Sequence, residues 1–224
     1  MQSRVSRTVD LRLYAIVDPE QSDDCAALAR RVALGGATLV QLRDKCSSTR
    51  EMIGRSRAIK AVLGSAGVPF LVNDRVDVAL AAGADGVHLG QDDMPTADAR
   101  RLLGPSAIIG LSVKTLEEAA GAPIEALDYV AVGGVFATAS KANPGPPIGT
   151  DGLASIVNAL RVRAPHLPIC AIAGINAGNA AQAIGAGADG VSVISALATA
   201  ADPEAAAREL RGIVNAGLAA RGRS

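Results

Sequence analysis

The chain has 224 residues, carries 22 basic and 22 acidic side chains, and contains two Phe, two Tyr and no Trp. A neutral chain lacks the basic field that attracts nucleic acid or a membrane surface, and scarce aromatic residues argue against base-stacking platforms. The length suits one α/β barrel, and the aliphatic, glycine-rich composition suits parallel strands packed against helices.

The N-terminus and the cysteines indicate the compartment. The first residues are polar and are not a secretory signal, and no stretch approaches the roughly 18 uninterrupted apolar residues of a membrane span. Cys25, Cys46 and Cys170 are isolated, and an odd number is a poor disulfide framework. We therefore expect a cytoplasmic protein with reduced thiols and with neither nucleic acid nor a membrane as a partner.

Short aliphatic runs alternate with helical segments along the chain. The strands are predicted at residues 11–17, 38–42, 69–72, 85–89, 107–111, 128–132, 169–173 and 189–194. The helices that follow them are predicted at residues 23–34, 50–63, 76–82, 95–104, 116–121, 151–163, 177–186 and 203–220. Cap and stop residues support these bounds, such as Ser48 before a helix and Gly83 after one.

This alternation indicates a parallel sheet, and the number of units predicts an α/β protein with a single (β/α)8 TIM barrel over residues 11–224, after a polar tail over residues 1–10. The phrase Gly-Ala-Asp-Gly-Val begins at Gly83 and again at Gly187. It indicates either two half-barrels or a common phrase that ends a helix and starts a strand. The Gly- and Pro-rich segment 133–150 is interpreted as an active-site loop.

Polar side chains gather where the predicted strands end, which in a barrel is a single rim. The segment Gln41-Leu-Arg-Asp-Lys45 ends one strand. If Leu42 faces the core, the side chains at 41, 43 and 45 share the opposite direction. Arg forks onto phosphate and Lys adds a point charge, so these side chains suit an anionic ligand, and surface ion pairs are the alternative. Further cations predicted on this rim are Lys114 and Lys141.

An acidic group lies on the same predicted rim. Asp74, Asp92 and Asp93 follow two neighbouring strands. Mg²⁺ takes one or two carboxylates and completes its octahedron with water and substrate phosphate oxygens. Acidic and basic groups on one rim therefore suit a Mg²⁺-pyrophosphate, although for Asp74 alone a helix cap is the alternative.

Two glycine-rich segments, 173–178 and 190–195, follow the last two predicted strands. In many barrels these loops bind a phosphate through backbone N–H groups, and plain turns are the alternative. Two phosphate-type sites on one rim suggest two phosphorylated substrates that are joined together. No nucleophile–base pair stands out, because a strand-end residue such as His88 is as often structural as catalytic, and His166 lies in a loop between prolines.

Several motifs, in order along nearly the whole chain, resemble the thiamine-phosphate synthase family. They are Gln41-Leu-Arg-Asp-Lys45, Val72-Asn-Asp74, Gly86-Val-His-Leu-Gly-Gln-Asp-Asp93, Gly110-Leu-Ser112, Thr138-Ala-Ser-Lys141, Ala173-Gly-Ile175 and Gly190-Val-Ser-Val-Ile-Ser195. The resemblance implies a (β/α)8 transferase that joins 4-amino-2-methyl-5-hydroxymethylpyrimidine diphosphate to 4-methyl-5-(2-phosphoethyl)thiazole and releases pyrophosphate. It implies a dissociative reaction with one Mg²⁺ per active site and small-molecule partners, and it is compatible with a homo-oligomer.

The resemblance also implies roles for the matching residues. The substrate-binding residues that it implies are Gln41, Leu42, Arg43, Asp44, Lys45, Asn73, Ser112, Thr138, Ala139, Ser140, Lys141, Gly174, Ile194 and Ser195. Of these, the thiazole phosphate would be held by Thr138, Ser140, Gly174, Ile194 and Ser195, and the pyrimidine diphosphate by Gln41, Arg43, Lys45, Asn73, Ser112 and Lys141. The implied catalytic residues are Arg43, Lys45, Ser112 and Lys141, and the implied Mg²⁺ ligands are Asp74 and Asp93.

The chain departs from the family pattern at three places. Lys114 stands where the family often has His, Gly133-Gly134 stands in place of Gly-Pro, and the run from Asn143 to Pro147 is unusual. Ser140 keeps the hydroxyl of a Thr, so thiazole-phosphate binding should survive. The alternatives on the same barrel are a thiazole tautomerase-like relative and a non-catalytic phosphate-ligand sensor. Loss of a metal-binding Asp or of a clamping Lys would favour them, and none is lost.

Overall fold

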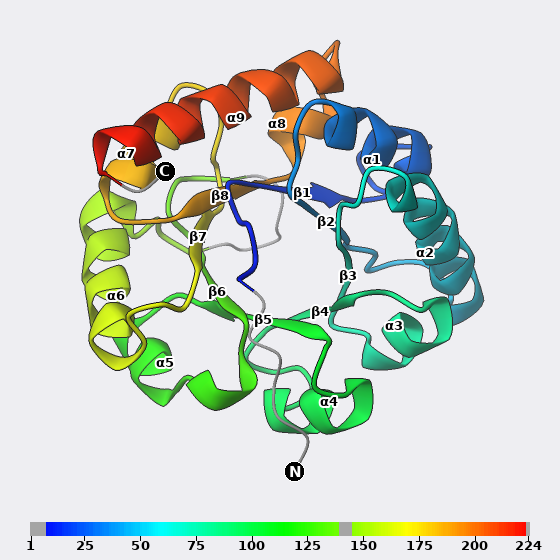
Figure 1. Cartoon of the computed structure of the whole chain (residues 1–224), viewed down its shortest axis with the longest axis horizontal. Coiled ribbons are helices and arrows are strands. Elements are labelled where there is room, and N and C mark those ends of the chain that lie inside the picture. The colour runs from blue at the N-terminus through cyan, green and yellow to red at the C-terminus, as the bar shows by residue number, and fades with distance from the viewer. Residues whose placement is uncertain (1–7, 139–144, 223–224) are drawn as a thin grey trace.

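A computed structural model describes residues 8–138 and 145–222 of the chain. Eight strands, each parallel to its neighbours, form a closed barrel in chain order, and helices surround it (Figure 1). The strands are β1 Leu13–Val17, β2 Leu39–Leu42, β3 Phe70–Asn73, β4 Gly86–Leu89, β5 Ile108–Val113, β6 Tyr129–Val132, β7 Ile169–Ile172 and β8 Gly190–Val193. The predicted TIM barrel is confirmed.

The helices follow the prediction with two additions. They are α1 Cys25–Leu34, α2 Thr49–Gly64, α3 Val76–Ala82, α4 Thr96–Leu103, α5 Leu116–Gly121, α6 Gly149–Arg163, α7 Ala180–Gly185, α8 Ser195–Ala198 and α9 Pro203–Ala220, with a 3₁₀ helix, η1, at Ile124–Ala126. The additions, α8 and η1, are too short to show a helical period in the sequence. Helix α7 begins later than predicted because the side chains of Asn176 and Asn179 hold the preceding residues in a turn.

Side chains of the strands alternate between the barrel interior and the layer beneath the helices. On β2, Val40 and Leu42 pack in the outer layer, whereas Leu39 packs in the interior cluster. Val9 and Leu11 precede β1 and are buried in the same interior cluster. Figure 1 shows this dark blue segment crossing the middle of the ring of strands. Residues 1–7 of the predicted tail lie outside the described residues.

Four polar side chains tie the strands together in pairs at the N-terminal end of the barrel. The residues directly before β2, β4, β6 and β8 are Thr38, Asp85, Asp128 and Asp189. Each side chain accepts a hydrogen bond from a backbone N–H at the start of the preceding strand. The donors are Leu13 at 3.1 Å, Phe70 at 2.9 Å, Ile109 at 2.8 Å and Ile169 at 3.0 Å. The three carboxylates also form ion pairs with Lys60, Arg100 and Arg161.

These contacts explain the repeated phrase Gly-Ala-Asp-Gly-Val. In its first copy Asp85 makes the strand-pairing bond, and a Cβ on Gly86 would lie 1.8 Å from the carbonyl oxygen of Ile108. Asp189 and Gly190 repeat both features in the second copy. The same bond recurs before β2 and β6 without the phrase, so the phrase marks a crowded strand start. Two half-barrels would also give this pattern, since β2 corresponds to β6 and β4 to β8.

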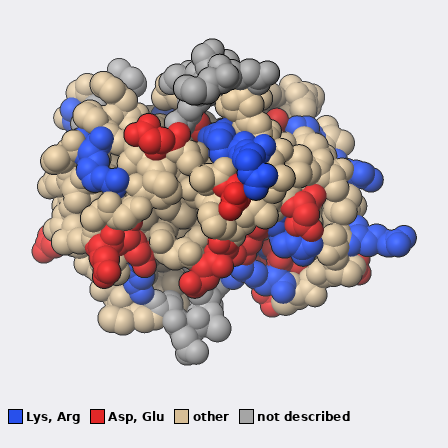
Figure 2. Space-filling view, turned by 90° about the horizontal axis from the view of Figure 1, so that it is seen from below, with Lys and Arg blue, Asp and Glu red and all other residues tan. Residues whose placement is uncertain are grey.

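The surface carries both signs of charge. Figure 2 shows Lys and Arg interspersed with Asp and Glu around the side of the barrel, without a broad area of one sign on that face. Among the described residues, no helix combines the length and apolarity that crossing a membrane requires.

We expect Gly86→Ala to destabilise the protein by about 3 kcal/mol or more, because the added methyl group would overlap the backbone of β5. Gly54→Ala is the matched control. Gly54 lies in α2, where a Cβ would have no heavy atom within 4 Å, so this change should stabilise the protein by roughly 0.5 to 1 kcal/mol. Urea unfolding of both variants measures the difference, and equal stabilities would contradict the close approach.

Candidate active site

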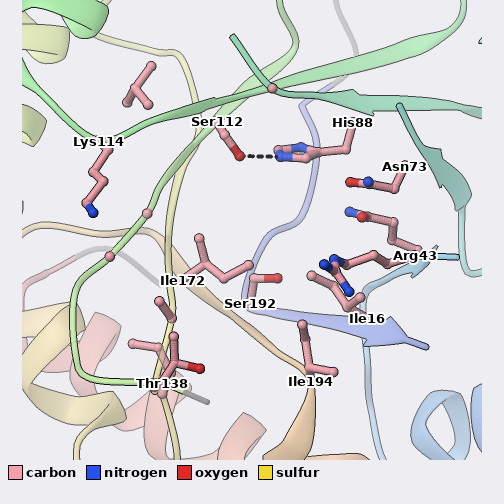
Figure 3. A pocket seen from close by; sticks show the side chains of 18 of the residues that line it. Ile16, Arg43, Asn73, His88, Ser112, Lys114, Thr138, Ile172, Ser192 and Ile194 are labelled. Carbon is pink, nitrogen blue, oxygen red and sulfur yellow. Dashed lines mark hydrogen bonds between the residues drawn. The ribbon is translucent and has the colours of Figure 1, made fainter. Parts of the chain in front are cut away.

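A cavity of about 630 Å³ opens at the C-terminal ends of the strands and is lined by residues from all eight strand ends. It brings together eleven of the residues implied above, which are Gln41, Arg43, Lys45, Asn73, Asp74, Asp93, Ser112, Thr138, Gly174, Ile194 and Ser195. In Figure 3, Arg43, Asn73 and His88 project from one side of the cavity and Lys114 from the other. Ala139, Ser140 and Lys141 lie outside the described residues.

Leu42 and Asp44 do not line this cavity, although they belong to the same pentapeptide. Because side chains alternate along β2, the Leu42 side chain packs in the outer core layer. The Asp44 side chain is fully buried and forms an ion pair with Arg55 of α2. It also accepts hydrogen bonds from the backbone N–H groups of Cys46 and Ser47. Asp44 therefore shapes the turn after β2, and it leaves Arg43 and Lys45 to face the cavity.

The two cations after β2 each contact a carboxylate. Arg43 Nη1 lies 2.6 Å from an oxygen of Asp18, whose side chain is only 2% exposed at the end of β1. Lys45 forms an ion pair with Asp74 after β3. Asp18 is absent from the predicted site residues, although its position directly after β1 is a signal for the rim. These carboxylates hold the cations in place before any ligand arrives.

Asp74 and Asp93 form an acidic pair at the ends of β3 and β4. Burial and the neighbouring Asp93 carboxylate raise the pKa of Asp74 above its usual value, and Lys45 opposes this rise. Asp74 has φ of 61°, which is unusual for a residue with a side chain. Asp93 accepts a hydrogen bond of 2.7 Å from the backbone N–H of Gly90. The fold thus holds two carboxylates together against their repulsion, as a cation site requires.

The acidic pair fits Mg²⁺ rather than a metal held wholly by protein. Among the described residues, there is no group of three or more His, Cys, Asp or Glu side chains that could hold a metal ion. Mg²⁺ is commonly bound through one or two carboxylates, with substrate phosphate oxygens and water completing the shell. Two carboxylates beside the cations of β2 match that pattern.

The ends of β7 and β8 form the least charged side of the cavity. Ala173 and Gly174 have φ of 90° and 65°. A Cβ on Gly174 would lie 2.3 Å from the carbonyl oxygen of Ala137, so the loop after β6 packs closely against this residue. Ser195 begins α8, the unpredicted short helix directly after β8, and in many barrels such a helix completes a phosphate site.

Lys114 also reaches the cavity, and its side chain occupies space left by two glycines. A Cβ on Gly134 would lie 2.8 Å from Lys114 Cε, and one on Gly145 would lie 3.0 Å from Lys114 Nζ. The departures at 114 and 134 are therefore in contact with one another. The larger Lys side chain is accommodated because Gly134 has no side chain.

The floor of the cavity contains a cluster of polar contacts that the sequence does not predict. His88 is buried, and its Nε2 lies 2.8 Å from Ser112 Oγ. Its Nδ1 lies 2.8 Å from the hydroxyl of Tyr129, which contacts Tyr14. The two tyrosines read as ordinary strand residues in the sequence, so only the barrel's closure shows that they meet beneath the cavity. Ile16, Ile172 and Ile194 add apolar surface against which a flat ring can pack.

Comparison with known proteins shows the family to which the chain belongs. The family model for thiamine monophosphate synthase matches residues 13–197. A thiamine-phosphate synthase of Agrobacterium fabrum is 50% identical over 215 residues, which are 95% of this chain and 98% of that protein. The chain belongs to the thiamine monophosphate synthase family. Like its relatives in that family, it is a transferase.

Other members of the thiamine monophosphate synthase family agree with this assignment. A thiamine-phosphate synthase of Moorella thermoacetica is 51% identical over 187 residues, covering 84% of this chain and 87% of that protein. The solved structure of a thiamine phosphate pyrophosphorylase from Pyrococcus furiosus has a TM-score of 0.83 and 40% identity, covering 94% of this chain and 98% of that one. A 3-hexulose-6-phosphate synthase, with a TM-score of 0.62 and 19% identity, shares the fold alone.

We expect Asp74→Asn to stabilise the metal-free protein, with Tm raised by about 2 °C, which corresponds to roughly 1 kcal/mol for this size. The amide avoids burying a charge and removes the repulsion by Asp93, which together outweigh the lost ion pair with Lys45. Asn also tolerates positive φ at least as well as Asp. Thermal unfolding in EDTA provides the measurement, and Asp92→Asn, at an exposed neighbour of Asp93, provides the control. A lower Tm for Asp74→Asn than for wild type would contradict the electrostatic account of this pair.

Proposed function

We propose that the chain joins the pyrimidine diphosphate to the thiazole phosphate, with release of pyrophosphate, to give thiamine monophosphate. The observation that carries this proposal is the single cavity that holds cations and carboxylates on one side and uncharged glycine-rich strand ends on the other. Such a cavity suits two phosphorylated substrates with unequal charge. The family membership supplies the identity of the two rings.

The cationic side of the cavity suits the diphosphate. Arg43 is fixed through one nitrogen by Asp18, so its planar fork is pre-organised and loses little freedom when it binds phosphate oxygens. Lys45, which is held by Asp74, adds a point charge that remains partly exposed to a ligand. Asn73 and Ser112 provide neutral donors nearby. Lys141 is proposed as a further phosphate-binding cation from the family motif alone.

We assign Mg²⁺ binding to Asp74 and Asp93. The support is their closeness and the raised pKa of Asp74, because burial first and the Asp93 carboxylate second disfavour a negative charge at this position. When bound, Mg²⁺ would supply positive charge to the diphosphate and so make it a better leaving group. One ion per cavity suffices for these two ligands.

The chemistry requires positioning more than proton transfer. The bond between the pyrimidine methylene carbon and the diphosphate oxygen breaks, its electron pair leaves with pyrophosphate, and the thiazole nitrogen donates its lone pair to the methylene carbon. Arg43 and Lys45 stabilise the charge that develops on the leaving group. Thr138, Gly174, Ile194 and Ser195 hold the thiazole phosphate, which places the ring nitrogen for attack. The described cavity residues include one Ser–His contact, between Ser112 and His88, and the reaction written here uses neither of them as a nucleophile or a base.

We also propose that the protein works in the cytoplasm. Cys25 and Cys170 are buried thiols and Cys46 is an exposed one, and none forms a disulfide. Unpaired cysteines suit a reducing compartment.

Pyrophosphate release tests the proposed reaction directly. Purified protein is given the pyrimidine diphosphate with and without the thiazole phosphate, in Mg²⁺ and in EDTA. We expect release only with both substrates and Mg²⁺, because Arg43 and Lys45 alone do not neutralise the negative charge of the diphosphate. No release under any of the four conditions would contradict the synthase function and would favour a tautomerase or a phosphate sensor.

Two substitutions at Asp93 separate its charge from its hydrogen bond to Gly90. Asp93→Asn keeps an oxygen that can accept this bond, and Asp93→Ala loses it. We expect both variants to lose turnover by at least about 100-fold, because the Mg²⁺ would lose a charged ligand, and to unfold at nearly the wild-type temperature. Asp98→Asn, on the exposed face of α4, is the control for removing one carboxylate. Turnover near wild type in Asp93→Asn would refute the metal assignment.

A further inference from the structure

A buried chain of hydrogen bonds runs across the barrel beneath the cavity and ends at two cavity residues. It begins with Gln41 on β2, whose amide nitrogen donates to the hydroxyl of Tyr14 on β1. The Tyr14 hydroxyl lies 2.9 Å from that of Tyr129 on β6, and Tyr129 lies 2.8 Å from Nδ1 of His88. His88 Nε2 then lies 2.8 Å from Ser112 Oγ on β5, the contact drawn in Figure 3.

The space for this chain is created by a glycine. A Cβ on Gly110 would lie 2.0 Å from the ring of Tyr129, so any side chain at 110 would displace the phenol. The Tyr129 and His88 rings also stack, with centroids 5.5 Å apart. The motif Gly110-Leu-Ser112 therefore supplies both the room for Tyr129 and the last member of the chain.

The number of protons fixes the direction of the chain. Burial raises the pKa of Tyr14 and of Tyr129 far above the usual value for a phenol, so each hydroxyl keeps its single proton. Tyr14 accepts from Gln41, which leaves its own proton for the contact with Tyr129. Tyr129 has then accepted one bond and donates its own proton to His88. His88 accepts at Nδ1, so its proton resides on Nε2 and is donated to Ser112.

The opposite direction would leave the cavity with the wrong polarity. Ser112 would then donate to His88 and present only lone pairs to the cavity, on the same rim as Arg43 and Lys45, whose charges suit an anion. In the forward direction Ser112 accepts from His88, and its own proton remains for a group in the cavity. An anionic oxygen is the natural acceptor for that proton.

We propose that Tyr14, Tyr129 and His88 are positioning residues, which hold His88 as the neutral Nε2–H tautomer and thereby aim the Ser112 hydroxyl proton at the diphosphate. The role of this proton rests on the proposed function, whereas the tautomer does not. A pre-aimed donor needs no reorientation when charge develops on the leaving group. The three residues act through Ser112 and need not touch the substrate.

Nitrogen-15 NMR of the ligand-free protein tests the tautomer. The chain contains only two histidines, so His166→Gln, at an exposed loop position, assigns the His88 signals. We expect an unprotonated Nδ1 and a protonated Nε2 in wild type. The opposite tautomer, or protons on both nitrogens, would overturn the proposal. This measurement does not depend on turnover, so it fails or succeeds independently of the synthase reaction.

Tyr129→Phe should break the chain while keeping the ring that packs against Gly110. We expect the Nε2–H preference of His88 to be lost and the KM for the pyrimidine diphosphate to rise about tenfold, the size of one hydrogen bond to a charged group. The KM for the thiazole phosphate should not change. Ser192→Ala removes a buried hydroxyl of the same cavity outside the chain, and His88 should keep its tautomer there.

A double-mutant cycle distinguishes positioning from general stability. If Tyr129 acts through Ser112, then Tyr129→Phe should cost little further affinity in a Ser112→Ala background. We therefore expect the double variant to match Ser112→Ala in its KM for the pyrimidine diphosphate. Additive losses would overturn the proposal, because they would mean that the Tyr129 hydroxyl affects diphosphate binding by a route other than Ser112.

Discussion

Closure of the eight-stranded sheet is the constraint on which the rest of the molecule depends. The hydrogen bonds made by Thr38, Asp85, Asp128 and Asp189 fix the relative position of neighbouring strands at the N-terminal end of the barrel. Since side chains alternate with a period of two, a shift of one residue would turn every cavity residue outward. The polar contacts at one end thus decide which side chains face the cavity at the other.

The cavity illustrates how a fold accommodates unfavourable charge. Arg43 and Lys45 each contact a carboxylate, and Asp74 and Asp93 are held close enough to repel one another. Asp74 carries the unfavourable features, because its pKa is raised by burial and by Asp93 and its backbone has positive φ. Such strain is typical of sites whose groups are arranged for a ligand. The strand contacts below the cavity stabilise the fold and so offset the free-energy cost of this arrangement.

The sequence predicts the fold well because the alternation of aliphatic strands and helical segments is strong in every unit. It predicts the rim as well, since the ends of parallel strands must meet. It does not predict the partner of Arg43 or the meeting of Tyr14, Tyr129 and His88, because these contacts join residues from different strands. The family motif alone implies that Asp44 binds the substrate. In the structure the Asp44 side chain is buried against Arg55 and points away from the cavity. Helix α8 is too short to leave a period in the sequence.

The position of the two tyrosines gives the protein a built-in optical probe. The chain has no Trp, so its near-ultraviolet absorption and intrinsic fluorescence come almost entirely from Tyr14 and Tyr129. Their rings lie 5.7 Å apart in an edge-to-face arrangement beneath the cavity. Light emitted by this protein therefore originates at the floor of its active site, and spectra of the unlabelled chain report on that one place.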